Sequence, residues 1–299
     1  MAKTAFSLAE EVKAMNRNCQ NDRLKFLIDK LVDHLHAYVV ETSLTADEWS
    51  AAIHFLGEAG KVCAETRQEF DILSGVLGVT TLVEDINNGK PAGATEPALL
   101  GPFFKEDAHK VENGDSIASE GKGDYLYVEG RVLDLQGNPV ANATIDTWEA
   151  DSSGLYDFQY ENQEDCRGRL HTAEDGSFSF RAIVPVPYPI PEDGPAANLL
   201  TSLGRHVYRP AHLHFVISAP GYESVTTQFY FKGDPYLTSD ATFGVKPSLI
   251  VTPEIVEDLA LSKARGFKDA KPHTYIKKDF VLVTPEQGIN ARAAVAAQN

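Results

Sequence analysis

The length, composition and charge of this chain exclude several classes of protein. Its 299 residues and 43% hydrophobic content suit one large domain, or a main domain with a smaller one, built around a sizeable core. The formal net charge of -16, without a long run of Lys or Arg, makes nucleic acid an unfavourable partner. No window approaches the roughly 20 apolar residues of a membrane span, and the N-terminal stretch has no continuous apolar segment. We therefore expect no membrane span and a cytoplasmic location.

The first part of the chain has the hydrophobic period of α-helices. Between residues 21 and 40 the apolar side chains recur every three or four residues, which predicts an amphipathic helix. They are Leu24, Leu27, Ile28, Leu31 and Leu35. Thr45 and Glu48 have the spacing of a capping box, which predicts that a second helix begins there and continues toward Gly57.

A third helix is predicted over residues 65–87. Its apolar positions are spaced for a helix, but it contains Gly75 and Gly78. Each glycine costs up to about 1 kcal/mol relative to alanine in a helix interior. We interpret them as small residues at a close helix contact.

After this region the hydrophobic period changes to that of β-strands. Short alternating segments separated by turn residues lie within 125–150, 174–186, 212–221 and 225–236. The residues from Gln136 to Pro139 predict a turn between the first two strands. Such strands bury their apolar faces best against a second sheet, which predicts a β-sandwich.

The predicted fold is therefore mainly β with an α-helical N-terminal part. We expect a helical N-terminal domain over residues 1–105 and a β-sandwich domain over 106–288. The last residues, 289–299, are predicted to be a flexible tail. The cysteines at positions 19, 63 and 166 are far apart, which argues against a disulfide framework and against a cysteine zinc site.

The segment YRPAHLHF, residues 208–215, places two histidines one residue apart in a predicted strand. Because successive strand side chains point to opposite faces, His212 and His214 project together, away from their apolar neighbours. Such a pair can bind a metal, bind a substrate or be exposed without a function. Glu223 follows nine residues after His214, and two histidines with one carboxylate form a ligand set typical of Fe(II).

Two tyrosines lie where they could be directed at a site. Tyr156 follows a turn signal in DSSGLYDFQYE, and Tyr188 lies between prolines in VPVPYPIPEDGP. Flanking prolines hold the backbone extended and remove N–H donors, so the loop is rigid. Each tyrosine could instead be a packed aromatic residue whose hydroxyl bonds to the backbone.

Five segments, in order along the chain, carry a resemblance to a known family. They are LGPFF, DTWEADSSGLYD, DGSFSFRAIVPVPYPIPEDGP, LGRHVYRPAHLHF and TTQFYFKGDPY, and residues 65–95 contribute as well. In these segments the chain resembles the intradiol ring-cleavage dioxygenases of the catechol and hydroxyquinol 1,2-dioxygenase group. The resemblance covers most of the chain beyond the first helices.

This resemblance implies a non-haem Fe(III) ion, one per subunit, bound by Tyr156, Tyr188, His212 and His214 with a water or hydroxide. Phenolate oxygens are hard anionic ligands that stabilise ferric iron, unlike a set of two histidines and a carboxylate. The implied substrates are O2 and a catechol-type diol. Both atoms of O2 would be incorporated into the product when the ring is cleaved. Tyr188 would dissociate from the metal and act as a base.

The resemblance also assigns two polar residues to the site. Arg209 would stabilise charge that develops on the substrate, although a structural salt bridge is the plainer interpretation. Gln228 would hydrogen-bond a histidine ligand or the arginine, although it could instead be a solvated strand residue.

The expected substrate pocket follows from the same resemblance. Its walls would come from Ile72, Gly75, Val76, Leu100, Gly101, Pro102, Phe103, Ile190 and Pro191, together with Arg209. The phrases YDFQYE and YPIPEDGP favour hydroxyquinol, benzene-1,2,4-triol, cleaved to maleylacetate or 3-hydroxy-cis,cis-muconate. Catechol, cleaved to cis,cis-muconate, is the alternative, because hydroxyquinol members tend to have an acid where this chain has a glycine, at position 75. A methylated or chlorinated catechol is a more distant choice.

Family members dimerise through their N-terminal helices, often around an apolar channel with bound lipid. The resemblance thus implies a homodimer and a possible phospholipid in the helical domain, although the apolar stripes could instead cover the chain's own sandwich. Two other classes of function stay open. A non-catalytic binding module would bury the same aromatic residues without a metal, and an Fe(II) or Mn(II) enzyme would use His212, His214 and Glu223.

Overall fold

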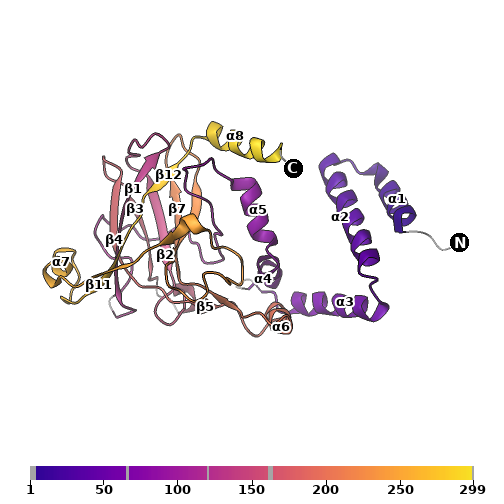
Figure 1. Cartoon of the computed structure of the whole chain (residues 1–299), viewed down its shortest axis with the longest axis horizontal. Helices are drawn as coiled ribbons and strands as arrows, with labels where there is room; N and C mark the ends of the chain where they lie inside the picture. Colours follow the sequence, from indigo (N-terminus) through magenta and orange to yellow (C-terminus); the bar gives the residue numbers. More distant parts are fainter. Residues whose placement is uncertain (1–4, 65–66, 120, 161–163, 298–299) are drawn as a thin grey trace. The chain divides into compact units, whose positions relative to one another are not determined.

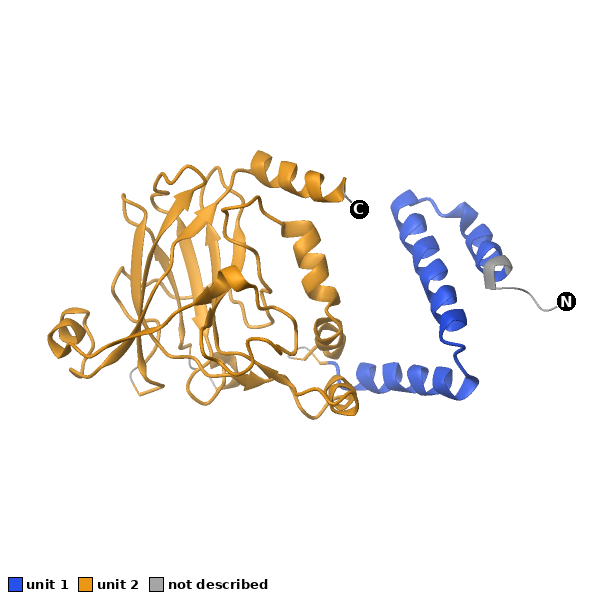
Figure 2. Ribbon diagram, viewed as in Figure 1, with its two compact units in different colours: residues 1–63 blue, residues 64–299 orange. Residues whose placement is uncertain are grey.

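The computed structural model of the chain describes residues 5–64, 67–119, 121–160 and 164–297. These residues form two compact units, one ending at residue 63 and the other beginning at residue 64 (Figures 1 and 2). The division therefore precedes the predicted border at residue 105. Backbone hydrogen bonds join residues 95 and 98 to sandwich residues 281 and 226, so the segment before 105 belongs with the sandwich. No helix in the described ranges is long and apolar enough to cross a membrane.

The first unit is helical, as the sequence predicts. Asn21 accepts a hydrogen bond from the Leu24 N–H and so caps the second helix. Thr45 and Glu48 form the predicted capping box at the start of the third. The elements are α1 Ala5–Met15, η1 Asn16–Asn18, α2 Asp22–Glu41 and α3 Ala46–Lys61.

The single helix predicted over residues 65–87 is wrong. The structure has two helices there, α4 Glu69–Val76 and α5 Val79–Asn88. Gly78 separates them with a φ of 75°, a left-handed conformation that side chains other than glycine adopt only with strain. The apolar spacing continues across this break, which is why the hydrophobic pattern alone suggests one helix.

The second unit is the predicted β-sandwich, formed by two five-stranded sheets in the described ranges. One sheet contains β1 Tyr125–Asp134, β4 Ser177–Ile183, β10 Glu254–Val256, β11 His273–Lys277 and β12 Phe280–Leu282. The other has the order β3 Arg167–His171, β2 Thr144–Glu149, β7 His212–Ser218, β8 Val225–Phe231 and β9 Ile250–Val251. The predicted turn after β1 is present, but β1 and β2 belong to different sheets, so it does not close a hairpin.

Shorter elements cover the ends of the sandwich. A ribbon of two residues per strand pairs β5 Tyr188–Pro189 with β6 Tyr208–Arg209. The remaining helical elements are η2 Asp157–Gln159, α6 Pro195–Ser202, η3 Pro247–Leu249 and α7 Leu259–Ala264.

The core lies between the two sheets and explains the alternation along β7. Leu213 and Phe215 are fully buried there. The Phe215 ring contacts Phe180 of β4 and Phe280 of β12, with ring centroids 6.3 and 4.9 Å apart. Burying one such side chain stabilises the fold by roughly 1.5 to 3 kcal/mol. Because this face of β7 is committed to the core, its other face is available for a site.

Residues 289–296 of the predicted flexible tail are instead part of a helix, α8 Pro285–Ala296, and residues 298–299 lie outside the described residues. Thr284 and Gln287 form a capping box at its start. Arg292 donates two hydrogen bonds to the Glu223 carboxylate, at 3.0 and 2.7 Å, and Lys90 also pairs with that carboxylate. These ion pairs hold the helix to the unit, whereas the alanine-rich sequence lacks an apolar stripe that would predict such docking.

One carboxyl group lies inside the sandwich without a charged partner. Glu149 on β2 is 1% exposed. One side-chain oxygen accepts a hydrogen bond from the Ile183 N–H at 3.0 Å, and the other has no partner among the described residues. Burial raises the pKa of Glu149 well above 4.5, and the charge of Asp165 raises it further.

We expect Glu149→Gln to raise the free energy of unfolding at pH 8 by about 1 to 3 kcal/mol. Above pH 4.5 the unfolded chain has released this proton while the folded chain retains it, so stability falls as pH rises toward the raised pKa. Urea unfolding at pH 5 and pH 8 would measure the effect. The exposed Glu112→Gln should change stability by less than about 0.5 kcal/mol. An equal loss of stability with pH in wild type and Glu149→Gln would contradict the assignment.

Candidate metal centre

Four side chains from three separate segments of the chain meet on the face of β7 that points away from the core. Tyr156 Oη lies 3.1 Å from His214 Nε2 and 3.3 Å from Tyr188 Oη. Tyr188 Oη lies 3.4 Å from His212 Nε2, which lies 3.0 Å from His214 Nε2. The four atoms therefore form a closed ring of neighbours. These are the four residues predicted as metal ligands.

Cross-strand pairing brings the histidines to this point. His214 on β7 is opposite Trp148 on β2 and Gln228 on β8, and His212 is opposite Tyr230 on β8. The His214 and Trp148 rings are stacked, with centroids 4.7 Å apart and an interplanar angle of 9°. Both histidines are 1% exposed. The neighbouring strands thus fix the orientation of each imidazole.

The two tyrosines come from segments outside the main sheets. Tyr156 precedes the short helix η2, where its N–H donates to the Gln159 side chain at 2.8 Å. The next residue, Asp157, forms a buried ion pair with Arg167 of β3, and this pair anchors the turn. Tyr188 lies on β5 directly opposite Arg209 on β6, so the ribbon carries two predicted site residues.

The two tyrosines differ in how tightly they are held. Tyr156 is 1% exposed, and its ring lies 4.2 Å from the Phe103 ring by centroids. Tyr188 is only half-buried and meets Tyr156 edge to face at 5.5 Å. One phenol is therefore enclosed, whereas the other reaches the site from a short ribbon at its border.

Hydrogen bonding and burial prepare the imidazoles to act as ligands. His212 Nδ1 donates to the Pro210 carbonyl at 2.8 Å, which leaves the Nε2 lone pair facing the other donor atoms. Burial and the Arg209 charge lower the pKa of His212 to about 3. Burial, with the charges of His212 and Arg209, lowers the pKa of His214 well below 6.5. Both rings are therefore neutral, the form that binds a metal.

Burial has the opposite consequence for the enclosed phenol. It raises the pKa of Tyr156 well above 10, and the neighbouring Tyr188 adds to the shift. A phenolate at this position therefore requires a cation in direct contact. A bound metal supplies such a cation, whereas a solvent-filled site does not.

Arg209 forms a salt bridge and also lies beside the candidate ligands, so both interpretations of this residue apply. It forms a salt bridge with Asp240, and its Nη1 lies 3.2 Å from His212 Nε2. Burial by itself lowers the pKa of Arg209, but the charges of Asp240, Tyr230 and Tyr188 raise it well above the usual value. A permanent positive charge therefore lies beside the four donor atoms.

Gln228 is fully buried, so its interpretation as a solvated strand residue is wrong. Its amide nitrogen donates to the Leu99 carbonyl at 2.6 Å and lies 3.1 Å from His214 Nδ1. Its carbonyl oxygen accepts from Arg209 at 3.3 Å and from the Tyr230 hydroxyl. Gln228 thus touches both groups that the sequence analysis proposes for it.

The residues predicted as pocket walls divide into two groups. Ile190 and Val76 share an apolar cluster in which Ile72 is partly buried, and Gly75 faces Thr242. A methyl group on Gly101 would lie 3.3 Å from the His214 ring, and the Phe103 ring contacts Tyr156 at a tilt of 34°. Leu100, Pro102 and Pro191 are exposed, and their part in the pocket stays a prediction.

Glu223, the carboxylate of the alternative Fe(II) site, is engaged elsewhere. Arg292 donates to both of its oxygens, and Lys90 pairs with one of them. Within the described ranges no group of three or more His, Cys, Asp or Glu side chains is arranged to hold a metal. In the part of the chain that the structure describes, no carboxylate therefore joins the two histidines in such a group.

Three residues that sequence reasoning missed complete the site. Trp148 stacks on His214, Tyr230 donates to Gln228, and Asp240 pairs with Arg209. Trp148 and Tyr230 lie on strands next to β7 and are opposite His214 and His212. The alternation of strand side chains could have suggested both residues, but only with the pairing of the strands known. Asp240 lies in a loop without a periodic pattern, so no sequence signal marks it.

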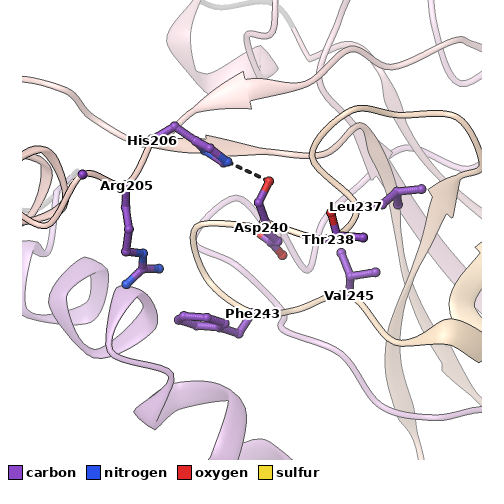
Figure 3. Close-up of a pocket in the computed structure, with 9 residues that line it drawn as sticks. Arg205, His206, Leu237, Thr238, Asp240, Phe243 and Val245 are labelled. Atoms are coloured by element: carbon purple, nitrogen blue, oxygen red, sulfur yellow. Dashed lines mark hydrogen bonds between the residues drawn. The ribbon is translucent and has the colours of Figure 1, made fainter.

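A cavity of about 490 Å³ is lined by residues of the loop that contains Asp240 and by residues 204–206 (Figure 3). Its lining includes Asp240 but none of the four candidate ligands. Three of its other polar side chains have partners: Arg205 donates to the Val76 and Ala241 carbonyls, and His206 pairs with Ser239. The cavity is therefore separate from the tyrosine and histidine cluster.

The spacing of the four donor atoms fits a bound metal. A metal about 2.0 to 2.1 Å from each ligand atom leaves neighbouring ligand atoms about 2.8 to 3.4 Å apart. The four distances around the ring are 3.0, 3.1, 3.3 and 3.4 Å. The set combines two phenol oxygens, which are hard ligands when deprotonated, with two imidazole nitrogens, which are borderline ligands.

Comparison with known proteins gives an independent result. A family model described as "Catechol dioxygenase N terminus" matches residues 21–95, and one described as "Dioxygenase" matches residues 99–282. A hydroxyquinol 1,2-dioxygenase of Rhizobium sp. (strain MTP-10005) is 45% identical over 277 residues, covering 92% of this chain and 94% of that protein. A catechol 1,2-dioxygenase of Candida albicans is 33% identical over 298 residues, covering 98% and 97%.

Among solved structures, the hydroxyquinol 1,2-dioxygenase of Pseudomonas putida DLL-E4 superposes with a TM-score of 0.87. It is 40% identical, and the match covers 94% of this chain and 98% of that one. Sequence and structure therefore point to the same relatives.

We expect Gly101→Ala to weaken metal binding by about 10- to 100-fold, because its methyl group would displace the His214 ring. Titration of metal-free protein with Fe(III), followed by metal analysis, would measure it. Gly137→Ala is the matched control, since Gly137 has a similar positive φ but no atom within 4 Å of the added methyl group. Both variants should lose about 1 to 2 kcal/mol from backbone strain. Equal metal binding by the two variants would contradict the expectation.

Proposed function

Since this chain belongs to the intradiol ring-cleavage dioxygenase family, we propose that it cleaves hydroxyquinol between its two adjacent hydroxylated carbons, with an Fe(III) ion as cofactor. O2 would be the second substrate, and both of its atoms would enter the product. The product would be 3-hydroxy-cis,cis-muconate or its tautomer maleylacetate.

The single observation that carries this proposal is the ring of two phenol oxygens and two imidazole nitrogens at 3.0 to 3.4 Å. Tyr156, Tyr188, His212 and His214 would hold the metal. Anionic phenolates stabilise the ferric state, which distinguishes this set from the Fe(II) set of two histidines and a carboxylate. When bound, the ferric ion would act as a Lewis acid that orients a chelating diol and draws electron density from it.

The unequal burial of the tyrosines supports different roles for them. Tyr156 is enclosed by Phe103 and the capped turn, so it would remain a permanent ligand. Tyr188 is half-buried on a short ribbon and has room to move aside when a substrate binds. Its phenolate oxygen would then take the proton from one substrate hydroxyl and become a neutral phenol.

Arg209 would stabilise negative charge on the substrate. Its Nη1 is 3.2 Å from the ligand atom of His212, and its charge is buried beside the ring of donor atoms. A fixed cation in a buried site acts strongly because little solvent screens it. The same charge would favour the doubly deprotonated diol over the neutral one.

The relatives support hydroxyquinol over catechol. The proteins named hydroxyquinol 1,2-dioxygenases are 45% and 40% identical to this chain, whereas the catechol 1,2-dioxygenase is 33% identical. Ile72, Val76 and Ile190 share one apolar cluster, which would supply the wall for the aromatic ring. Gly101 and Phe103 would form the opposite side, next to His214 and Tyr156.

We expect the iron-loaded protein to convert hydroxyquinol with a kcat/KM at least about tenfold higher than for catechol, a difference of about 1.4 kcal/mol in transition-state binding. Turnover under labelled O2, followed by mass spectrometry, should show two labelled oxygen atoms per product. One labelled atom or none would exclude a dioxygenase, and faster turnover of catechol would reverse the substrate assignment.

The ligand assignment is tested in the same preparations. A broad visible absorption band from phenolate-to-iron charge transfer should be present and should shift when a diol is added without O2. Tyr156→Phe and Tyr188→Phe should each weaken the band, whereas Glu223→Gln should leave it unchanged. A colourless iron-loaded protein that loses its metal in Glu223→Gln would favour the site of two histidines and a carboxylate. Unaltered metal content in all three variants, with no turnover, would favour a binding module.

We also propose that the chain forms a homodimer through its N-terminal helices. Leu24, Leu31 and Leu35 on α2 are 49 to 51% exposed. On α3, Trp49 and Ile53 are 55% and 49% exposed. Apolar faces of this kind are typical of protein interfaces.

The family resemblance also implies a bound phospholipid in the helical domain, and this remains a prediction.

Sedimentation equilibrium should give twice the 32.7-kDa chain mass. Replacing Leu31 and Leu35 together by glutamate should shift the protein to monomers by placing charges in an apolar interface. The exposed Lys232→Glu, on the sandwich, is the control and should remain dimeric. A wild-type monomer at micromolar concentration would contradict the proposal.

A further inference from the structure

We propose that Asp240 is a positioning residue for ring cleavage, because it holds the Arg209 guanidinium with one nitrogen directed at the ligand cluster. This inference rests on the proposed function and goes beyond it. Asp240 lies in the loop between β8 and η3, outside every segment that carries the family resemblance, and neither alternation nor a motif marks it.

The first support is the geometry of the guanidinium. Arg209 Nε and Nη2 lie 3.2 and 3.3 Å from the two oxygens of Asp240, so the carboxylate contacts two nitrogens at one edge of the group. A guanidinium is planar and rigid, so fixing two nitrogens also fixes the third. That third nitrogen, Nη1, lies 3.2 Å from His212 Nε2.

The neutral partners of Arg209 would not impose the same orientation by themselves. Gln228 and Tyr230 both contact only Nη2, at 3.3 and 3.2 Å. A group held through one nitrogen can still rotate about that contact. Among the described residues, Asp240 is the carboxylate paired with Arg209, and it supplies the second point of attachment.

The second support is that Asp240 is itself held rigidly. Its first oxygen accepts from the Thr242 N–H and hydroxyl, both at 3.1 Å. Its second oxygen accepts from the Gly244 N–H at 2.9 Å. The side chain is 2% exposed, although Asp240 also contributes to the lining of the cavity in Figure 3. A carboxylate with this many donors cannot follow the arginine if the arginine moves.

The loop also connects Arg209 to the predicted pocket wall. Thr242 approaches within 3.5 Å of where a Gly75 methyl group would lie on α4, and its carbonyl accepts from Thr81 of α5 at 2.9 Å. Phe243 has a φ of 59°, a strained conformation for an aromatic residue, which the bonds around Asp240 maintain. Asp240 therefore ties the arginine and this wall to one loop.

We expect Asp240→Asn to lower kcat for hydroxyquinol by about 100-fold with less than a threefold change in iron content. Asparagine has nearly the same shape as aspartate, but one of its two acceptor oxygens is replaced by an N–H₂ donor. That donor would face an N–H group of Arg209 or of the loop, so at least one hydrogen bond would be lost. The matched control is Asp146→Asn. Counted as whole residues, Asp146 and Asp240 are both 5% exposed, and Asp146 accepts from Arg169 Nε and Nη2, at 2.6 and 3.0 Å. It should lower the melting temperature while kcat stays within about threefold.

A double-mutant cycle separates positioning from a general structural role. Arg209→Gln should itself lower kcat by about 100- to 1000-fold. If Asp240 acts through the arginine, Asp240→Asn should lower kcat by less than about threefold further in the Arg209→Gln background. A further loss of 30-fold or more would overturn the proposal, because it would show that Asp240 acts by another route.

Two further measurements keep the test decisive. If Asp240→Asn does not fold, Asp240→Glu retains the charge but displaces the carboxylate, and it should still lower kcat at least about tenfold. A crystal structure of either metal-free variant should show Nη1 displaced by more than about 1 Å from its position beside His212. An unmoved arginine with normal kcat would overturn the proposal. A wild-type protein that neither binds iron nor cleaves hydroxyquinol would instead overturn the proposed function.

Discussion

Register across one face of the sheet formed by β2, β7 and β8 is the constraint on which the rest of the site depends. It places Trp148, His214 and Gln228 in one row, and His212 next to Tyr230 in the adjacent row. A slip of one residue along β7 would turn the histidines into the core and Leu213 out of it. The sandwich cannot accept such a slip, because it would bury two imidazoles in an apolar core and expose a leucine. The core therefore enforces the orientation of the ligands.

The electrostatics of the site follow from that burial. The histidines stay neutral because charging them beside Arg209 in a buried site is unfavourable. The buried phenol of Tyr156 stays protonated unless a cation is in contact with it. The protein thus arranges four donor atoms that a metal can use and supplies one permanent charge, Arg209, which Asp240 balances. Exchange of the metal for solvent would leave the phenol neutral.

Much of the rigidity around the four donor atoms comes from ion pairs between residues that are not candidate ligands. Arg167 and Asp157 anchor the turn that carries Tyr156, and Asp240 anchors Arg209. Each pair joins segments that are irregular in backbone conformation to a strand of the sandwich or to its ribbon. A buried pair of this kind adds little net stability, but loss of one partner leaves an unpaired buried charge. Such pairs therefore fix the positions of Tyr156 and Arg209 more than they stabilise the fold.

Local sequence patterns determined much of this protein. The period of three to four residues predicted α2, the Thr45 and Glu48 pair predicted the start of α3, and alternation predicted the strands and the shared face of His212 and His214. These features depend on neighbours within a few residues, and a sequence displays such neighbours directly. The resemblance of five segments then indicated which tyrosines would join the histidines.

Only the tertiary structure decided the rest. It divided the predicted third helix at Gly78, it docked the C-terminal helix through Arg292 and Glu223, and it brought Asp240 to Arg209. It also assigned β1 and β2 to different sheets. Each of these outcomes depends on backbone conformation or on contacts between residues far apart in the chain. A charged side chain in a loop has no period, so its partner is known only when the chain is folded.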